Sequence, residues 1–404
     1  MSGGFNNHRL AVKVTVIFLS GVLVGATLPW FTPKKGADGR ESLRVEEVGP
    51  QIFAEVLEKI DQYAVFPPPP GGMDGMIATS LKTYLTKQDP YSDYLNPAEY
   101  VQFGKASRKI PGSIGLDVEK TRDGDVICYP TVGGPAALAG VKPGDLLLAI
   151  DGVSTQGRSL PAIVALALGK AGKSVVLDIA GSSGTHRQLN VTRSQRAIAS
   201  ITEYAFHDLR IIRIGNFTAA TRQKLDYIVS RWPESRPIII DFRSCGGGDF
   251  NSSVDSAMLF LGQNERIVSV VGRNKTSLYS STMRRDRQRQ QVFLWQDEFT
   301  ASAAEVFIAA LTENARATSI GKKTAGKGTR QDIIELQSGG ALFITTGYLA
   351  TPNGLRFDGE GLLPMYFLMG PNADTDSFYN QTVQLLKKAD GRYEIESGDK
   401  TSGH

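Results

Sequence analysis

Apolar positions along the chain change their spacing twice, and each change indicates a new region. Between residues 52 and 63 they recur on one face of a predicted helix. From residue 110 onward they form short runs separated by turns, which is typical of a small β-rich domain. After Ser194 apolar strands alternate with helical stretches, and buried strands are predicted at residues 238–240 and 292–295. This order predicts an α/β core that follows a β-rich domain and a helical region.

The same patterns divide the chain into regions. A chain of 404 residues is long enough for two or three domains of ordinary size, together with terminal segments. The expected boundaries are 1–35 for an export segment, 36–107 for a tether and the helical region, 108–195 for the β-rich domain, 196–370 for the α/β core, and 371–404 for a C-terminal helix with a polar tail.

The N-terminal region has the features of a targeting segment. Arg9 and Lys13 precede an apolar run from Val14 to Val24, and two small residues follow it. This order predicts a secretory signal that is cleaved. If the apolar run continues through Phe31, its length comes near the lower limit for crossing a bilayer, and the segment would remain as a membrane anchor. A buried core helix is a third interpretation, and export is the prediction.

Composition narrows the possible chemistry. Lys and Arg number 45 against 41 Asp and Glu, so the net charge of +4 does not favour nucleic acid as a partner. Hydrophobic residues make up 41% of the chain, which excludes a disordered protein. The two cysteines, Cys128 and Cys245, provide neither a zinc site nor a disulfide framework, and the four histidines lie in no known catalytic motif. We therefore expect no metal and no cofactor, and a hydrolase here needs a base other than histidine.

A candidate nucleophile stands at Ser302. The predicted strand at 292–295 ends shortly before it, and an alanine-rich helix begins just after it. That position places a hydroxyl beside the N–H groups of a helix start, which can stabilise an oxyanion. Ser302-x-x-Glu305 is also a capping box, which satisfies the same N–H groups without any catalysis. The local pattern leaves both interpretations open.

A candidate base follows 25 residues later, at Lys327 between Gly326 and Gly328. A lysine acts as a base only when it is neutral, and burial can lower its pKa by roughly 3 units from about 10.4. A solvated lysine and a phosphate-binding lysine are the alternatives. The P-loop pattern needs Ser or Thr where Gly328 stands, so a phosphate site is disfavoured.

Three glycines, Gly246 to Gly248, follow the predicted strand at 238–240. Glycines at a strand end let backbone N–H groups approach a ligand closely, although an ordinary turn explains them equally well. Cys245 precedes them and shares no motif with a histidine or lysine. We therefore interpret Cys245 as a small buried residue and not as a nucleophile.

Together these segments resemble the C-terminal processing peptidases, which are serine proteases with a Ser–Lys dyad and a PDZ domain. The family motifs T-A-S-A-S-E and G-K-G-x-x-Q are similar to residues 300–305 and 326–331. The motif D-L-R-x-N-P-G-G resembles residues 241–248, and D-P-H-S-x-Y-L resembles residues 89–95. Residues 112–116 resemble the loop with which a PDZ domain begins. Several motifs in the right order are far more specific than any one of them.

The resemblance implies an α+β multidomain fold: an α/β protease core of the ClpP/crotonase type, an inserted PDZ domain and an N-terminal helical region. It implies a serine endopeptidase that works through an acyl-enzyme. Ser302 would be the nucleophile, Lys327 its general base, and Gln331 would orient the lysine. The backbone N–H groups of Gly247 and Ala303 would form the oxyanion hole.

The same resemblance implies which partners the protein meets. Ile114, Gly115 and Leu116 of the PDZ loop would bind the free C-terminal carboxylate of a substrate. The expected partners are protein or peptide substrates with free C-termini, an adaptor or activator protein, and further copies of this chain in a homo-oligomer. With its export segment, the protein is expected in the periplasm, either released or anchored in the inner membrane.

The chain also departs from the family pattern. Ala304 stands in place of the second serine, residues 297–299 read Asp-Glu-Phe where Asn-x-Gly is usual, and Leu168 stands where many relatives carry arginine. The altered residues 297–299, which precede the Ser302 motif, allow a second interpretation: a PDZ scaffold that binds chain ends without cleaving them. Leu168 leaves open whether PDZ-linked activation operates. A lipid- or retinoid-binding relative of the same core is a third interpretation, which the intact Ser–Lys pair disfavours.

Overall fold

A computed structural model describes residues 48–66, 71–108, 112–181, 183–195, 200–283, 290–370 and 374–389. The expected export segment, the tether up to residue 47 and the polar tail after residue 389 lie outside the described residues. Among the helices of the described ranges, none combines the length and the apolar character needed to cross a membrane. The chain forms two compact units, one ending at Pro67 and the other beginning at Pro68.

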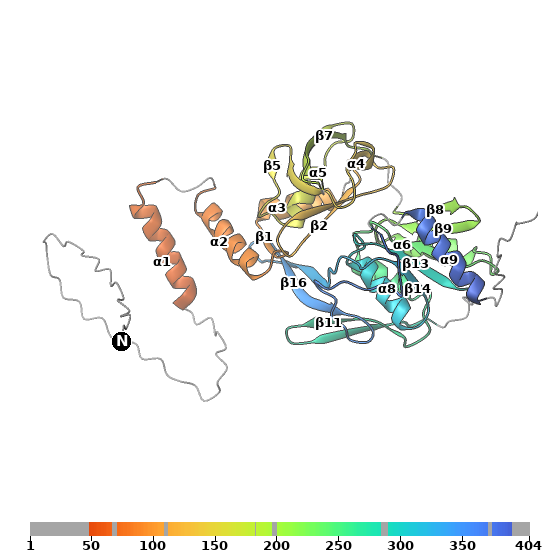
Figure 1. The fold of residues 1–404 in the computed structure, drawn as a ribbon. Helices are drawn as coiled ribbons and strands as arrows, with labels where there is room; N and C mark the ends of the chain where they lie inside the picture. The colour runs from red at the N-terminus through yellow and green to blue at the C-terminus, as the bar shows by residue number, and fades with distance from the viewer. Residues whose placement is uncertain are drawn as a thin grey trace, which may run out of the picture. The chain divides into compact units, whose positions relative to one another are not determined.

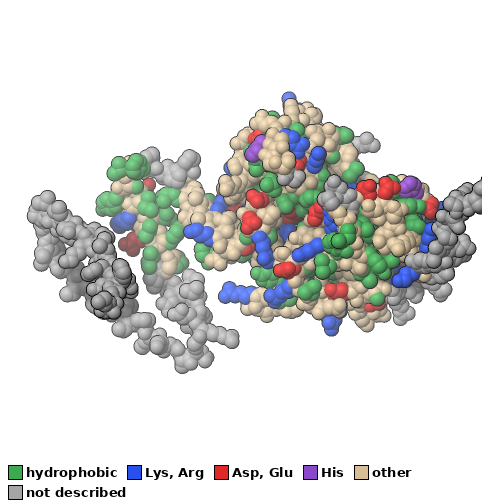
Figure 2. Space-filling model, viewed as in Figure 1, with side chains coloured by type: hydrophobic (Ala, Val, Ile, Leu, Met, Phe, Trp, Pro, Cys, Tyr) green, Lys and Arg blue, Asp and Glu red, His purple; other side chains and the backbone are tan. Residues whose placement is uncertain are grey.

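The described part of the first unit is helix α1 (Val48–Tyr63), which confirms the helix predicted over residues 52–63. Its apolar side chains remain on the surface, with Ile52, Val56 and Tyr63 exposed to solvent. Figure 2 shows hydrophobic side chains gathered along this helix. The amphipathic pattern thus gives a helix whose apolar side chains remain exposed within the described part of this unit, residues 48–66.

Within the second unit, the β-rich domain is built on an antiparallel sheet in the order β2-β3-β4-β6-β7, with β5 paired to β4. Its core is apolar and contains fully buried side chains such as Ile163 and Leu177. Helix α5 begins after Ser159, whose hydroxyl accepts the N–H of Ala162, and it packs on the sheet. The elements are β2 (Leu116–Lys120), β3 (Val126–Pro130), α4 (Pro135–Leu138), β4 (Leu146–Ile150), β5 (Val153–Ser154), α5 (Leu160–Ala167), β6 (Ser174–Ala180) and β7 (His186–Thr192).

The α/β core contains a sheet in the order β17-β14-β13-β10-β9-β8 (Figure 1). Neighbouring strands are parallel except β8 and β9, which form an antiparallel pair. The buried strands predicted at 238–240 and 292–295 are confirmed. The strands are β8 (Ile201–Phe206), β9 (Leu209–Ile214), β10 (Ile238–Asp241), β13 (Val292–Gln296), β14 (Thr318–Gly321) and β17 (Tyr366–Phe367).

Helices cover both faces of this sheet. Alternation along β10 shows the two layers: Ile238 and Ile240 join the core that contains Leu311 of α8, whereas Ile239 joins the core that contains Phe378 of α9. A strand buried on both faces is continuously apolar, which explains the run at 238–240. The covering helices are α6 (Thr221–Ser230), α7 (Phe250–Ala257), α8 (Ala303–Glu313) and α9 (Thr375–Ala389).

A second sheet joins β1, which lies between α2 and α3, to the core; of its strands the sequence predicted only β11, as an apolar run at 267–271. Its order is β1-β16-β11-β12, and β15 pairs with β16. The other strands mix polar and apolar residues without a clear period, so the pattern gives little signal there. The elements are α2 (Gly72–Gln88), β1 (Asp93–Leu95), α3 (Pro97–Arg108), β11 (Arg266–Gly272), β12 (Thr276–Ser280), β15 (Thr329–Glu335) and β16 (Ala341–Ala350).

Candidate active site

Three neighbouring parallel strands, β10, β13 and β14, carry the candidate segments at their carboxyl ends. The glycine segment follows β10, Ser302 follows β13, and Lys327 follows β14. Because parallel neighbours end at the same edge of a sheet, these three segments meet there although they are distant in the sequence.

The glycine segment packs directly against Ser302. Gly247 has φ +111°, and a Cβ atom added there would lie 2.7 Å from Ser302 Cβ and 3.0 Å from the backbone nitrogen of Ala303. Its carbonyl accepts the N–H of Phe217 at 2.7 Å, which fixes the orientation of the loop. A side chain at this position is therefore excluded by contact and by conformation. Gly247, Ser302 and Ala303 come together as the motifs predict.

Ser302 has an unusual backbone conformation. Its φ is 56° and its ψ is −118°, a combination that non-glycine residues rarely adopt and that costs about 1–3 kcal/mol. The neighbouring Ala301 donates its N–H to the carbonyl of Cys245 at 2.9 Å, which ties this turn to the glycine segment. Strain of this kind persists only where the surroundings determine the conformation, and it marks the turn as a candidate functional position.

Glu305 is the residue that connects the two predicted motifs. Its fully buried carboxylate accepts the N–H of Ser302 at 2.7 Å and the N–H of Lys327 at 2.9 Å. The same group accepts the N–H of Gly326 at 2.8 Å and the hydroxyl of Thr324 at 2.5 Å. Burial raises the pKa of Glu305 to about 7, although these donors lower it. The Glu305 part of the capping box is therefore present, and it also holds the loop of Lys327.

Lys327 lies in the core but contacts the β-rich domain. Its ammonium group forms an ion pair with Glu119 of β2 and lies 5.5 Å from the ring centroid of Tyr91. The side chain is about 10% exposed. Burial lowers the pKa of Lys327 from its ordinary 10.5 to about 7, while the charge of Asp358 raises it. Burial favours the neutral base, whereas an ion pair with Glu119 favours the charged form.

The glycines beside Lys327 allow its loop to pack closely against a neighbouring segment. A Cβ atom at Gly326 would lie 2.6 Å from the nitrogen of Gly361, and one at Gly328 would lie 2.6 Å from the nitrogen of Asp358. Gly328 also donates its N–H to the Asp358 carboxylate at 3.1 Å. Both glycines are thus required by contact, and they hold Lys327 in a fixed loop.

Two further residues that the sequence analysis considered are Gln331 and Cys245. The Gln331 amide lies in β15, where it donates to the hydroxyls of Thr329 at 2.9 Å and Thr345 at 3.1 Å. It therefore connects β15 and β16, and the structure gives it no hydrogen bond to the Lys327 amine. Burial raises the pKa of Cys245 to about 12, so this thiol is protonated at neutral pH.

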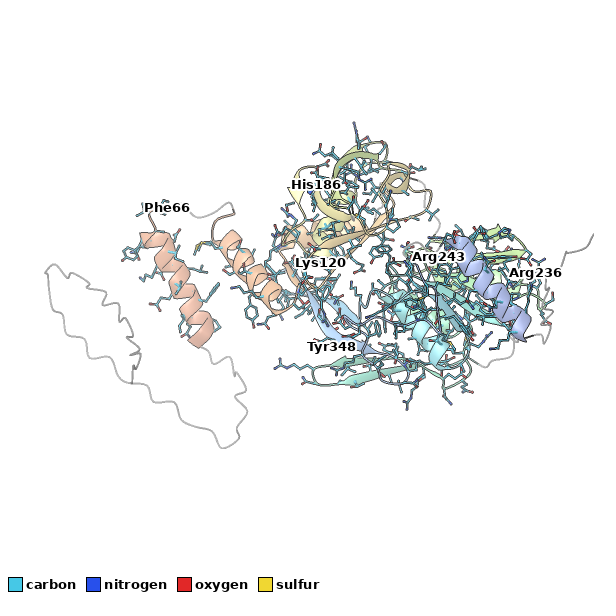
Figure 3. The ribbon with its side chains drawn as sticks, viewed as in Figure 1. Phe66, Lys120, His186, Arg236, Arg243 and Tyr348 are labelled. Carbon is cyan, nitrogen blue, oxygen red and sulfur yellow. The ribbon has the colours of Figure 1, made fainter. Side chains whose placement is uncertain are left out.

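A buried charge cluster supports the start of the glycine segment. Asp241 accepts hydrogen bonds from Arg213 at 3.0 Å, Arg243 at 2.9 Å and Tyr204 at 2.8 Å. Burial alone would raise the pKa of Asp241, but hydrogen bonds from Arg243 and the charges of both arginines hold it below its ordinary value. The Arg243 guanidinium also lies 4.7 Å from the ring centroid of Phe378, beside α9 (Figure 3). The cluster fixes the end of β10.

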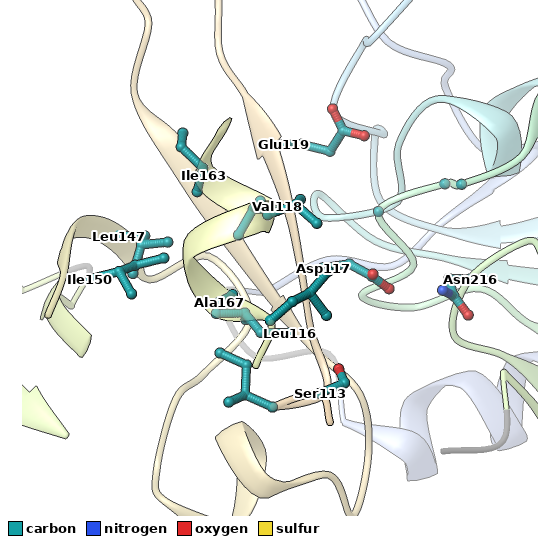
Figure 4. A pocket seen from close by; sticks show the side chains of 16 residues that line it. Ser113, Leu116, Asp117, Val118, Glu119, Leu147, Ile150, Ile163, Ala167 and Asn216 are labelled. Carbon is teal, nitrogen blue, oxygen red and sulfur yellow. The ribbon is translucent and has the colours of Figure 1, made fainter. Parts of the chain in front are cut away.

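A cleft of about 340 Å³ joins the β-rich domain to the glycine segment (Figure 4). It is lined by β2, by α5 and by Gly246 to Gly248. The predicted carboxylate loop, which includes Ile114 and Leu116, lies at one end of this cleft. In that loop Gly115 has φ +65° and donates its N–H to the Ser113 hydroxyl at 3.1 Å.

Several residues of this region were not predicted. Asp117 of β2 forms a hydrogen bond with Asn216, and Glu119 of β2 pairs with Lys327. Glu305 was interpreted only as a cap. The capping pattern could have identified Glu305, but contacts between separate domains leave no local signal. Within the described ranges, no group of three or more His, Cys, Asp or Glu side chains is arranged to hold a metal ion.

Comparisons with known proteins agree with this arrangement. Residues 208–366 match peptidase family S41, and residues 126–181 match the PDZ domain. A probable CtpA-like serine protease of Staphylococcus saprophyticus is 27% identical over 87% of this chain and 71% of its own length. The carboxy-terminal processing protease CtpA of Bacillus subtilis is 25% identical over 86% of this chain and 75% of its own length.

A solved structure shows that the fold is also shared. The structure of a photosystem II D1 C-terminal processing protease superposes with a TM-score of 0.66 at 22% identity, over 81% of this chain and 95% of that one. The predicted α+β architecture, with a peptidase domain and a PDZ domain, is therefore confirmed.

Proposed function

Because this chain belongs to the C-terminal processing proteases of peptidase family S41, which are serine proteases with a PDZ domain, we propose that it cleaves proteins through a Ser302–Lys327 dyad. Its substrates are proteins or peptides with free C-termini, which the PDZ domain binds. Cleavage proceeds through an acyl-enzyme.

The observation that carries this proposal is the shared carboxylate of Glu305. It binds the backbone of Ser302 and the backbone of Lys327 at the same time, so two motifs 25 residues apart are held in one place. A capping box alone accounts for the first contact but not for the second. Positioning of this kind is what a nucleophile and its base require.

In the proposed reaction, the Ser302 hydroxyl attacks the scissile carbonyl and gives its proton to the neutral amine of Lys327. The N–H groups of Gly247 and Ala303 stabilise the oxyanion. The peptide C–N bond then breaks, the leaving amine takes the proton, and water hydrolyses the ester. A pKa of about 7 supports Lys327 as the base, because a useful fraction is neutral near physiological pH. Gln331 acts as a positioning residue by fixing the strand that follows the lysine.

The PDZ domain supplies substrate recognition in this proposal. Ile114, Gly115 and Leu116 bind the terminal carboxylate with backbone N–H groups, and the last side chain enters the apolar part of the cleft. The cleft continues to Gly247, which supports delivery of the bound chain toward Ser302.

The test is cleavage of an unfolded model protein with a free apolar C-terminus by wild type, Ser302→Ala and Lys327→Ala. Both variants are expected to lose cleavage. Ser230→Ala and Lys323→Ala, which change exposed residues of the same types, serve as matched controls and should keep it. Unchanged cleavage by Ser302→Ala would refute the mechanism.

A scaffold that binds chain ends without cleaving them is the second candidate. The ion pair between Lys327 and Glu119 favours it, because a paired lysine is charged and cannot act as a base. If wild type binds peptides through their free C-termini but cleaves none of them, the scaffold function is the correct one.

We also propose that the protein is exported and works in the periplasm, alone or with an adaptor, as a homo-oligomer. The apolar run at 14–24 supports export. Cell fractionation of the full chain, followed by N-terminal sequencing, tests whether that segment is cleaved or kept as an anchor.

A further inference from the structure

Strand β2 of the PDZ domain carries two acidic residues, Asp117 and Glu119. Among the described strands, β2 pairs only with β3 and lies at the edge of its sheet, where a peptide can add as a further strand. Asp117 and Glu119 both line the cleft next to this edge (Figure 4).

Alternation along β2 determines where these side chains point. Leu116 and Val118 pack against the apolar core of the PDZ domain, so Asp117 and Glu119 point to the opposite face of the strand. On that face Asp117 meets Asn216 and Glu119 meets Lys327, both from the peptidase core. The two carboxylates therefore stand between the domains, along the path of a bound chain.

The cleft has no basic residue among those that line it, so its charge comes from the two carboxylates. The basic residue that follows them on β2, Lys120, is buried and donates to the carbonyl of Pro90 at 2.8 Å (Figure 3). Desolvation of the Asp117 carboxyl by the surrounding protein raises its pKa to about 6. The hydrogen bond with Asn216 opposes this rise. Asp117 can therefore attract a cationic side chain near neutral pH, whereas Glu119 exchanges one cation, the Lys327 ammonium group, for another.

The register of a bound chain follows from the position of its terminal carboxylate. With the carboxylate at the loop of Ile114 to Leu116, the last residue of an antiparallel peptide lies opposite Leu116. Each step back along the peptide advances one residue along β2. The penultimate residue then lies opposite Asp117, and the fourth residue from the end lies opposite Glu119. Cross-strand neighbours point to the same face, so these two peptide side chains meet the two carboxylates.

We propose that the cleft selects protein chain ends with Lys or Arg at the penultimate position and at the fourth position from the end. The Asp117 carboxylate binds the basic side chain at the penultimate position, and the Glu119 carboxylate binds the one at the fourth position from the end. This specificity rests on the proposed function, in which the PDZ domain binds free C-termini.

The selection by Glu119 has a consequence for Lys327. Glu119 holds one cation in the structure, and that cation is the ammonium group of Lys327. A basic side chain at the fourth position from the chain end competes for the same carboxylate. Its binding removes from Lys327 the partner that keeps it charged. A matching substrate therefore both occupies the cleft and favours the neutral base.

The experiment measures binding of fluorescent decapeptides by anisotropy, with the full chain carrying Ser302→Ala so that no cleavage occurs. The peptides end in the same apolar residue and carry Lys, Gln or Glu at either of the two positions. Lys is expected to bind about 3- to 10-fold more tightly than Gln at each position, and Glu more weakly. The preference is expected to shrink as salt is added.

Variants assign each position to its carboxylate. Asp117→Asn should remove the preference at the penultimate position only, and Glu119→Gln the preference at the fourth position only. Asp123→Asn, which changes an exposed acid in the turn after β2, is the matched control and should keep both. Because the peptide series on the Ser302→Ala protein requires no change in the cleft, poor folding of a variant would not prevent the test.

Three results would contradict the proposal, and they differ in what they overturn. Equal affinity for Lys and Gln peptides overturns the charge selection but leaves capture of C-termini standing. A Lys preference that survives in both cleft variants overturns the assignment to Asp117 and Glu119. Equal affinity for free and amidated C-termini overturns the capture itself, and with it the part of the proposed function in which the PDZ domain binds free C-termini; cleavage by Ser302 and Lys327 is tested separately.

Discussion

The pH dependence of cleavage is a direct test of Lys327 as the base. Burial lowers the pKa of this lysine from 10.5 to about 7, with the charge of Asp358 opposing the change. At pH 7 about half of the molecules would then carry a neutral amine, against about three in ten thousand for an unperturbed lysine. The fraction of competent base therefore rises by roughly a thousandfold. Holding the amine in this state costs the fold about 5 kcal/mol relative to a solvated lysine.

The assay is kcat/KM for a peptide without titratable side chains, measured from about pH 5.5 to about pH 9. A base works only when neutral, and neutralisation increases as the pH rises through the pKa. Activity should therefore increase about tenfold between about pH 6 and about pH 8 and then level off. Lys327→Arg, which keeps the positive charge but does not lose its proton, should be inactive over the whole range.

The pH profile of the Glu119→Gln variant provides a second test of the same reasoning. Because its ion pair favours the charged lysine, Glu119→Gln should move the rise in activity about one pH unit lower. A profile that is flat for wild type would show that Lys327 is not the base. A profile that has not levelled off and is still rising tenfold per pH unit at about pH 9 would show that this lysine is solvated during catalysis, which contradicts its burial.

Three substitutions probe the supporting structure. Gly247→Ala places a Cβ atom 2.7 Å from that of Ser302 at φ +111°, so turnover should fall at least about 100-fold while peptide binding persists; near-normal turnover would contradict the contact. Glu305→Gln replaces one acceptor oxygen by a donor, so kcat should fall about 10- to 100-fold with little change in KM; a change in KM alone would contradict a positioning role. Asp241→Asn leaves Arg243 without its charged partner and should lower the free energy of unfolding by about 3–5 kcal/mol in urea titrations, whereas a loss below about 1 kcal/mol would show that the cluster is not needed.

The parts of the site that could be predicted are those with a local signal. The strands at 238–240 and 292–295 are continuously apolar because helices cover both of their faces, and such runs are easily recognised. The helix after Ser302 was equally clear, since its alanine-rich sequence is almost entirely buried. Family motifs then indicated which residues at the ends of these elements form the site, which periodicity alone could not provide.

The parts that could not be predicted depend on contacts between distant segments. Glu119 and Lys327 are 208 positions apart and lie in different domains, so no sequence pattern near either residue indicates their ion pair. The strands β15 and β16 escaped prediction because they are partly exposed and irregular in hydrophobicity. Gln331 consequently lies in a strand, with its amide between two threonine hydroxyls, where the motif had suggested a contact with the lysine.

The spacing of 25 residues between Ser302 and Lys327 follows from the topology of the sheet. The chain leaves the end of β13, returns through α8, passes along β14 and reaches the same edge one strand further on. One β-α-β unit therefore places the two residues side by side, and Glu305, from the first turn of α8, joins their backbones across that edge.

Different residues contact the backbone and the side chain of Lys327, the base of the proposed dyad. Glu305 holds the backbone of Lys327 from within the peptidase core, whereas Glu119 reaches only its side-chain amine from the PDZ domain. A change of partner at the amine thus alters the charge of the lysine without requiring its loop to move. In the proposed mechanism, catalytic competence depends on the occupant of the Glu119 carboxylate, and a substrate that supplies its own cation there should be cleaved faster than a neutral one.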